Sequence, residues 1–278
     1  MTWTIQPRSE RAGLATLEAG PEGAPLILAL HGVGLRAEAW GAQIAGLAGR
    51  ARIVAPDMPG HGESAVAPGC TTIADYTDRA EAVLMALGAP ALVMGHSMGA
   101  MIALKLAARQ PDLVRGVLAL NAVFERDAAA TAAVMARADA LGGVARSDPA
   151  PTLTRWFGEA GSSERDACAA WLSGVDPVGY RAAYRAFASS RIPDRAGLSR
   201  LACPAMFMTG ADEPNSTPAM SQAMAALAPL GRAEIVKGAA HMLPMTHPEP
   251  VNAALLGRAS GRPGEGRMTQ RISDRKGA

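Results

Sequence analysis

The sequence is poor in the features that cross-link a chain or anchor it to a membrane. Only three of its 278 residues are cysteine (Cys70, Cys168 and Cys203), an odd number at spacings that suit neither a disulfide framework nor a metal site. No apolar run approaches the roughly 18–20 residues that a membrane span needs, and residues 1–20 lack the apolar stretch of a secretory signal. We therefore expect a cytoplasmic protein that binds no membrane.

The sequence also has little excess of charge of either sign. The net charge is +2, and segment 258–278 alone carries six basic residues against two acidic ones. The rest of the chain is close to neutral, so it offers no basic surface for nucleic acid. Because residues 257–278 are rich in Gly, Arg and Ser without apolar periodicity, we expect them to form a disordered basic tail.

The sequence is rich in apolar residues instead. Hydrophobic residues make up 49% of the chain, charged residues 19%, and the mean hydropathy is +0.09, which is typical of a well-buried enzyme. A length of 278 residues is near the upper limit for one hydrophobic core. We expect one core domain with an inserted segment, as a monomer or homodimer.

Short apolar runs alternate with longer helical patterns, which predicts an α/β fold: a mostly parallel sheet flanked by helices on both faces. A hairpin within Trp3–Glu18 would add an edge to this sheet. The expected strands are Leu26–Leu30, Arg52–Ala55, Ala91–Met94, Val117–Asn121, Ala205–Thr209 and Glu234–Val236. The expected helices around them are Ile73–Leu87, Met98–Arg109, Thr217–Leu227 and Pro248–Leu256.

Residues 124–199 break this alternation, because they contain helical patterns and no convincing strand. The patterns lie near Asp127–Leu141, Glu164–Leu172 and Pro177–Ala188. We interpret the segment as an inserted helical cap on a core formed by residues 1–123 and 200–256. The cap holds seven of the eleven aromatic residues, and these either form its own small core or line a substrate pocket.

The sequence Gly-His-Ser-Met-Gly at Gly95–Gly99 directly follows a predicted strand and directly precedes a predicted helix. A G-x-S-x-G turn in this setting forces its serine onto a tight bend beside a helix N-terminus, which favours developing negative charge. Ser97 is therefore the predicted nucleophile.

A serine hydroxyl needs a base within hydrogen-bond reach. Of the five histidines, His241 follows the last predicted strand, so it lies at the same sheet edge as Ser97 and is the predicted base. A carboxylate at the end of strand Ala205–Thr209 should orient it, and the sequence offers both Asp212 and Glu213 there.

Two main-chain amides are expected to stabilise the oxyanion. One is that of Met98, directly after the nucleophile, and the other is that of Val33 in the glycine-rich turn after the first parallel strand. This chemistry requires no metal and no cofactor.

The order and spacing of four motifs resemble those of the α/β-hydrolase superfamily. They are His-Gly-Val-Gly-Leu at 31–35 with Trp40 downstream, Asp-Met-Pro-Gly-His-Gly-Glu-Ser at 57–64, the Ser97 motif, and Gly-Ala-Ala-His at 238–241. Within the superfamily the chain is similar to the esterase, enol-lactonase, carbon–carbon bond hydrolase and cofactor-free haloperoxidase branch. The resemblance implies a Ser–acid–His triad, an acyl-enzyme and a helical cap. Relatives carry Gly-x-x-Asp at the acid position, and that register favours Glu213 over Asp212.

These observations predict a serine hydrolase that cleaves a small carboxylic ester or lactone. A carbon–carbon bond hydrolase or a perhydrolase would use the same triad, and a non-catalytic binding protein of this fold is a third alternative. A dinucleotide-binding protein is a further possibility for an α/β chain, but no Gly-x-Gly-x-x-Gly follows the first strand. Pocket residues are expected at Trp156, Tyr184 and Met242. Candidates to hold a substrate carboxylate are Arg36, Arg155, Arg181 and Arg185.

Overall fold

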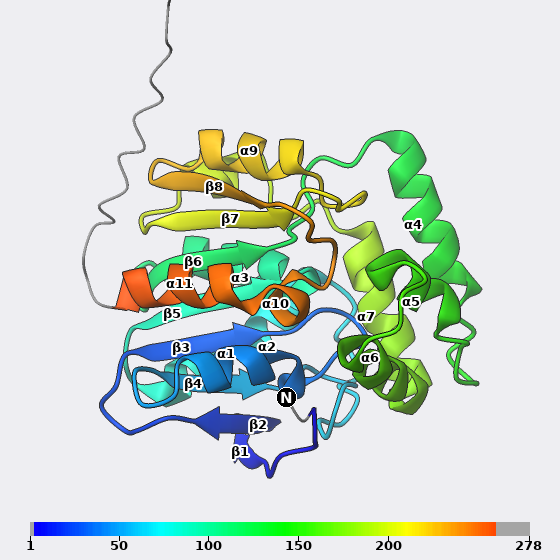
Figure 1. The fold of residues 1–278 in the computed structure, drawn as a ribbon, viewed down its shortest axis with the longest axis horizontal. Helices are drawn as coiled ribbons and strands as arrows, with labels where there is room; N and C mark the ends of the chain where they lie inside the picture. Colours follow the sequence, from blue (N-terminus) through cyan, green and yellow to red (C-terminus); the bar gives the residue numbers. More distant parts are fainter. Residues whose placement is uncertain (1–2, 260–278) are drawn as a thin grey trace, which may run out of the picture.

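The computed structural model describes residues 3–259, and its centre is an eight-stranded sheet (Figure 1). The strand order is β1-β2-β4-β3-β5-β6-β7-β8, in which β3 to β8 pair in parallel while β1 and β2 form an antiparallel edge. The mostly parallel sheet and the expected hairpin are therefore confirmed. The strands are β1 Ser9–Arg11, β2 Leu14–Ala19, β3 Leu26–Leu30, β4 Arg52–Pro56, β5 Ala91–His96, β6 Val114–Leu120, β7 Ala205–Gly210 and β8 Gly231–Val236.

Strand β3 illustrates why the central strands are continuous apolar runs rather than alternations of apolar and polar residues. All five of its residues are buried. Leu26, Leu28 and Leu30 belong to the apolar core on one face of the sheet, whereas Ile27 and Ala29 belong to the core on the other face. Successive side chains of a strand point to opposite faces, so a strand covered on both sides must be apolar throughout.

Helices cover both faces of the sheet (Figure 1). One layer consists of η1 Ala37–Trp40, α1 Gly41–Gly46, α10 Leu243–Thr246 and α11 Pro248–Ala259, and α1 and α11 lie in front of the sheet in the figure. The other layer consists of α2 Ile73–Leu87, α3 Met98–Arg109, α8 Arg195–Ser199 and α9 Pro218–Leu227. The sequence did not predict the short helices η1, α1, α8 and α10.

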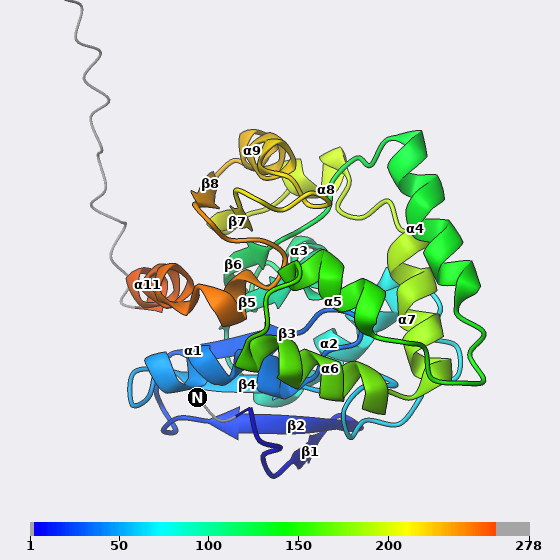
Figure 2. The same cartoon turned by 45° about the vertical axis from the view of Figure 1, so that its right-hand side comes forward.

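Four further helices lie between β6 and β7, and Figures 1 and 2 show them beyond the carboxyl ends of the parallel strands. We call them the inserted helices: α4 Ala128–Ala140, α5 Ala150–Phe157, α6 Ser163–Gly174 and α7 Pro177–Ser189. Three of them match predicted helical patterns, and α5 was missed. Helix α8 also falls within the predicted insertion, but it packs against α3 and α9 in the layer that covers the sheet.

Close backbone contact joins the inserted helices to the core. Gly179 in α7 lies against Gly60, and a Cβ atom on either glycine would overlap the main chain of the other. Gly34 likewise has a positive φ of 78°, and a Cβ atom there would overlap Leu172 of α6 and Tyr180 of α7. These glycines let the inserted helices approach the loops at the carboxyl edge of the sheet.

The end of the described chain differs from the expectation. Helix α11 continues to Ala259, so residues 257–259, which were assigned to the disordered tail, are helical. The remainder of the predicted tail lies outside the described residues. Between residues 3 and 259, no helix is both long and apolar enough to cross a bilayer.

Candidate active site

Ser97 occupies the turn between β5 and α3 in a conformation that few residues other than glycine adopt. Its φ is 55° and its ψ is −115°, and it directly precedes the first residue of α3. Non-glycine residues with positive φ are strained and cluster at functional sites. The two glycines of the motif make the turn possible, since a Cβ atom at Gly95 would overlap the carbonyl of Gly99, and one at Gly99 would overlap that of Leu30.

His241 lies in the loop after β8, and three groups fix its ring and main chain. Its Nδ1 is 2.9 Å from Oε2 of Glu213. The indole of Trp156 stacks on the imidazole, with ring centroids 5.6 Å apart and an angle of 25° between the planes. The carbonyl of His241 accepts a hydrogen bond from Nε2 of His96 at 2.8 Å. The imidazole is thus held in one orientation, with Nδ1 directed at a carboxylate.

The carboxylate in contact with His241 is that of Glu213, whereas the neighbouring Asp212 makes no contact with the imidazole. The Asp212 amide donates to the carbonyl of Ala239 at 3.0 Å, and its side chain is exposed. Glu213 is turned inward, with a side chain that is 0% exposed. Its Oε1 accepts hydrogen bonds from the amides of Asn215 at 2.7 Å and Ser216 at 3.1 Å, which leaves Oε2 for His241.

This environment keeps the Glu213 carboxylate ionised. Burial raises the pKa of the group, but the charge and hydrogen bond of His241, together with the two amide donors, outweigh burial and lower the pKa to about 2. A permanently charged carboxylate beside Nδ1 fixes the tautomer of the imidazole and stabilises its cationic form.

The other buried histidines stay neutral and have structural contacts. Burial and the proximity of His241 lower the pKa of His96 to about 3, and because a carbonyl only accepts, the hydrogen of His96 is on Nε2. His31 accepts from the amide of Met58 with Nε2 at 2.9 Å, so its hydrogen is on Nδ1, directed at the carbonyl of Gly32. Burial lowers the pKa of His61 to about 3.

The start of α3 and the loop that carries Val33 both lie beside Ser97. Met98 is the first residue of α3, where main-chain donors lack intrahelical partners. The loop that carries Val33 lies against Ser97, since a Cβ atom at Gly32 would be 3.2 Å from Cβ of Ser97. Within residues 3–259, neither amide has a recorded hydrogen-bond partner. Both donors are therefore free to face a ligand.

A cavity of about 280 Å³ lies between the sheet edge and the inserted helices. Ser97, His241, Val33 and the predicted pocket residues Trp156 and Tyr184 all line it. The expectation for Met242 was wrong. That side chain is 1% exposed and packs in the apolar core, so it is not among the residues that line the cavity.

Three arginines line the part of the cavity formed by the inserted helices and the segment before them: Arg126, Arg137 and Arg155. The only carboxylate among the described lining residues is that of Asp127, which accepts a hydrogen bond from the amide of Ala130 at the start of α4. The arginines therefore give this part of the cavity wall a net positive charge.

The three arginines differ in how many of their guanidinium nitrogens donate hydrogen bonds to protein oxygens. Arg126 donates to the carbonyls of Ala188 at 3.1 Å and Phe187 at 2.9 Å. Arg155 donates to the carbonyl of Pro151 at 2.9 Å and to Oγ1 of Thr152 at 2.8 Å. Arg137 donates only through Nε, to the hydroxyl of Tyr184 at 3.2 Å, as far as the described residues go.

The sequence anticipated one of these arginines and missed two. Arg155 was a candidate and lines the cavity, whereas Arg36 pairs with Glu38 and Glu63, and Arg185 pairs with Asp139. Arg181, the fourth candidate, is not among the cavity residues. The sequence places Arg137 on a predicted helix, but the direction of its side chain depends on how α4 packs on the rest of the structure.

A model of the α/β hydrolase family matches residues 27–254, which is most of the chain. The chain belongs to the α/β hydrolase family. The predicted α/β-hydrolase fold is thereby confirmed.

Similar proteins in this family are hydrolases. An (E)-2-((N-methylformamido)methylene)succinate hydrolase from Acinetobacter baylyi is 40% identical over 84% of this chain and 89% of that protein. A pimeloyl-[acyl-carrier protein] methyl ester esterase from Edwardsiella ictaluri is 32% identical over 85% of this chain and 93% of that protein. Among solved structures, a malate-bound thermophilic esterase from Thermogutta terrifontis superposes with a TM-score of 0.77 at 26% identity, covering 87% of this chain and 91% of that one.

Within the described range, no group of three or more His, Cys, Asp or Glu side chains is arranged to hold a metal ion. The three cysteines are buried, and burial raises the pKa of the Cys168 thiol well above its ordinary value.

Proposed function

We propose that the protein is a serine hydrolase in which Ser97 is the nucleophile, His241 the general base and Glu213 the acid of the triad. The hydroxyl of Ser97 attacks an acyl carbonyl and gives its proton to His241. His241 then protonates the leaving group, and the acyl group stays on Ser97. Water attacks this acyl-enzyme, His241 again takes and returns the proton, and the carboxylic acid is released with Ser97 restored.

The amides of Val33 and Met98 are the donors for the oxyanion in both tetrahedral intermediates. They belong to a glycine-rich loop and to the first turn of α3, and neither has another recorded partner within residues 3–259. Preorganised amides aimed at a developing negative charge supply a large part of the rate enhancement in acyl transfer, on the order of a hundredfold or more for each donor.

The substrate that fits this cavity is a small molecule that carries a carboxylate. Three arginines line a cavity of about 280 Å³, and Arg137 has its two terminal nitrogens without a recorded partner in the described part of the chain. A guanidinium group binds a carboxylate through two parallel hydrogen bonds. The relative from Acinetobacter baylyi supports this substrate class, because the compound in its name is a succinate, with two carboxylates.

The acyl bond is that of an ester or a lactone, as the sequence predicts, or an N-acyl bond. The second candidate is favoured by the same relative, whose named compound carries an N-methylformamido group. Both bonds give the same acyl-serine chemistry, and only the leaving group differs: an alkoxide in one case and an amine in the other.

The observation that carries the proposal is the contact between Glu213 and His241 beside the strained turn at Ser97. A fluorophosphonate probe should label Ser97 of the purified protein, and Ser97→Ala should lose both the label and turnover while keeping its circular dichroism spectrum. The loss of turnover should be about a millionfold. Labelling at another residue, or activity that survives Ser97→Ala, would exclude this mechanism.

A substrate panel tests the second half of the proposal. Hydrolysis of (E)-2-((N-methylformamido)methylene)succinate should be compared with that of succinate monoesters, small lactones and neutral acetate esters of similar size. We expect kcat/KM to be highest for compounds with a free carboxylate. A preference for neutral esters would contradict the assignment of the arginines while leaving the triad intact.

A further inference from the structure

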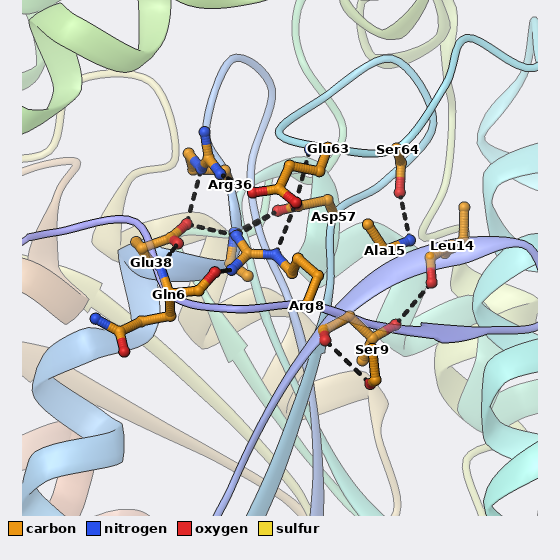
Figure 3. A network of polar contacts seen from close by, with 12 residues as sticks. Gln6, Arg8, Ser9, Leu14, Ala15, Arg36, Glu38, Asp57, Glu63 and Ser64 are labelled. Atoms are coloured by element: carbon orange, nitrogen blue, oxygen red, sulfur yellow. Dashed lines mark hydrogen bonds and ion pairs between the residues drawn. The ribbon is translucent and has the colours of Figure 1, made fainter.

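A buried cluster of charged side chains joins the start of the chain to the loop that carries Val33 (Figure 3). Arg8, directly before β1, donates through Nε to Oδ2 of Asp57 at 2.9 Å and through Nη2 to Oε2 of Glu38 at 2.7 Å. Its Nη1 donates to the carbonyl of Gln6 at 2.8 Å. The side chains of Arg8, Glu38 and Asp57 are 4%, 3% and 0% exposed, so the guanidinium group is enclosed, and each of its three nitrogens donates a hydrogen bond.

The two carboxylates that Arg8 holds also bind the far end of the Val33 loop. Oδ1 of Asp57 accepts from the amide of Ala37 at 2.8 Å. Oε2 of Glu38 accepts from Nε of Arg36 at 2.7 Å. In Figure 3, Glu38 and Asp57 converge on the Arg8 guanidinium group from separate segments of chain, and Arg36 contacts the same carboxylate of Glu38. Residues 36–38 are therefore fixed by groups that share one cation.

The near end of the same loop is fixed independently. His31 accepts from the amide of Met58 at 2.9 Å, and Met58 is the neighbour of Asp57. Asp57 also accepts from the amide of Glu63 through Oδ2 at 3.0 Å. Segment 57–63 thus contacts the Val33 loop at both ends, and Arg8 forms an ion pair with Asp57, the first residue of this segment.

The segment before Arg8 contacts both the charged cluster and the inserted helices. Trp3 contacts Trp171 of α6 edge to face, with ring centroids 6.3 Å apart. It also packs on Gly41, where a Cβ atom would be 3.3 Å from the indole. The amide of Gln6 donates to Oε1 of Glu38 at 2.9 Å. Residues 3–8 therefore connect α6 to the charged cluster.

Such a cluster needs a reason beyond stability. Removing charges from water is costly, and apolar side chains of similar volume often serve a fold as well as a buried ion pair. Ion pairs differ from apolar contacts in that they fix relative positions, because a planar guanidinium group holds two carboxylates in a defined geometry. The position of an oxyanion donor must be fixed in this way, since small displacements of reacting groups lower the rate by large factors.

We propose that Arg8 is a positioning residue for the reaction: through Asp57 and Glu38 it sets the position of the Val33 amide that binds the oxyanion. This inference rests on the proposed serine-hydrolase function. Arg8 touches no substrate and is not a catalytic residue. Since the oxyanion forms only after attack on the carbonyl, losing its alignment should lower kcat and leave KM nearly unchanged.

The test is the steady-state kinetics of the full chain with Arg8→Gln and Arg8→Lys. The matched control is Arg11→Gln, because Arg11 lies in the same hairpin but pairs with Glu18 instead of the cluster. Active sites are counted by the end point of labelling with a fluorophosphonate, so that kcat refers to folded enzyme only. We expect Arg8→Gln to lower kcat by about 10- to 100-fold, somewhat less than the loss of an oxyanion donor. KM should stay within about threefold, and Arg11→Gln should behave as the wild type.

Arg8→Lys keeps the charge but not the fork, so its kcat should fall between those of the wild type and Arg8→Gln. Arg8→Lys also tests the inference if Arg8→Gln does not fold. Millimolar guanidinium ion added to Arg8→Ala should restore part of the lost kcat, which a general loss of folding would not allow.

Two results would overturn the inference: a wild-type kcat per labelled site in Arg8→Gln or Arg8→Lys, or a rise in KM at constant kcat. Failure of the proposed function is recognised separately. A wild type that is not labelled at Ser97 removes both proposals, whereas a labelled wild type with fully active Arg8 variants removes this one alone.

Discussion

Oε2 of Glu213 accepts the Nδ1–H of His241 at 2.9 Å, while Oε1 of the same carboxylate is held by two main-chain amides. Asp212, one residue earlier, is exposed and makes no such contact. Glu213→Gln should therefore lower kcat on the order of ten-thousandfold, because an amide in this place no longer fixes the tautomer or stabilises the imidazolium.

The matched variant is Asp212→Asn, which we expect to stay within about twofold of the wild type, as surface changes away from a site generally do. Both variants should be measured with the same chromogenic ester and with labelled active sites counted. A larger fall for Asp212→Asn would reverse the assignment, and small falls in both would mean that another group orients His241.

The contrast between these two neighbours marks the limit of what the sequence can predict. The motif at Gly95–Gly99 specifies its own strand, turn and helix, so Ser97 is placed by local residues. The acid is not, because its direction is set when the amides of Ala211 and Asp212 bond to the carbonyls of Val236 and Ala239. Those partners are distant in the sequence, and the Gly-x-x-acid register only hinted at the outcome.

The other misses have physical causes of their own. Helix α5 is short and begins among prolines, so its apolar residues give too few repeats for a periodic signal. Arg137 lines the cavity only because α4 packs on α7 at this angle, which no local pattern encodes. Met242 follows His241 in sequence, but its side chain packs in the apolar core, where partners distant in the sequence surround it.

Trp156 should affect both binding and turnover. Its indole lines the cavity and also stacks on His241 at 5.6 Å, so Trp156→Ala removes an apolar wall and one support of the base. We expect KM for bulky acyl substrates to rise about tenfold, the value of an aromatic contact of about 1.5 kcal/mol. For a minimal acetate ester, KM should change less and kcat should fall.

Two conservative variants separate the contributions. Trp156→Phe keeps a ring over His241 and should restore most of kcat. Tyr184→Phe removes only the hydroxyl that accepts from Arg137, so it should alter KM for carboxylate substrates and spare neutral ones. Equal losses for every substrate in all three variants would point to damaged packing, since truncating a core aromatic costs roughly 3–5 kcal/mol.

Acid should destabilise the fold through Glu213 and Glu38. Burial raises the pKa of Glu38, but its hydrogen bonds with Arg8, the Gln6 amide and Arg36 lower the pKa to about 2, as for Glu213. Each carboxylate has an ordinary pKa of 4.5, so its contribution is complete above that value and is lost as the pH falls toward 2. Each contributes on the order of 3 kcal/mol at neutral pH.

Urea unfolding between pH 7 and pH 2.5 measures this effect. The wild type should lose stability progressively below pH 4.5, and its advantage over Glu38→Gln should be largest at pH 7 and shrink as the pH falls. A difference in the free energy of unfolding that stays constant over this range would contradict the depressed pKa of Glu38.

Arg137 is the arginine best placed to bind a substrate carboxylate. Its Nε is held by the hydroxyl of Tyr184 at 3.2 Å, and its terminal nitrogens have no recorded partner within the described residues, whereas Arg126 and Arg155 already donate to protein oxygens. A charged hydrogen bond of this kind contributes about 1.5–3 kcal/mol. Arg137→Gln should therefore raise KM for a succinate monoester by about 10- to 100-fold.

The same variant should hydrolyse a neutral ester of equal size with unchanged kcat and KM, because Ser97 and its partners are untouched. Arg185→Gln is the matched control, since Arg185 pairs with Asp139 outside the cavity, and it should leave both substrates unaffected. Arg137→Lys retains the charge without the planar fork and should recover only part of the affinity. If Arg137→Gln weakened both substrates equally, the arginine would be holding the inserted helices rather than the substrate, and carboxylate binding would have to be sought at Arg126 or Arg155.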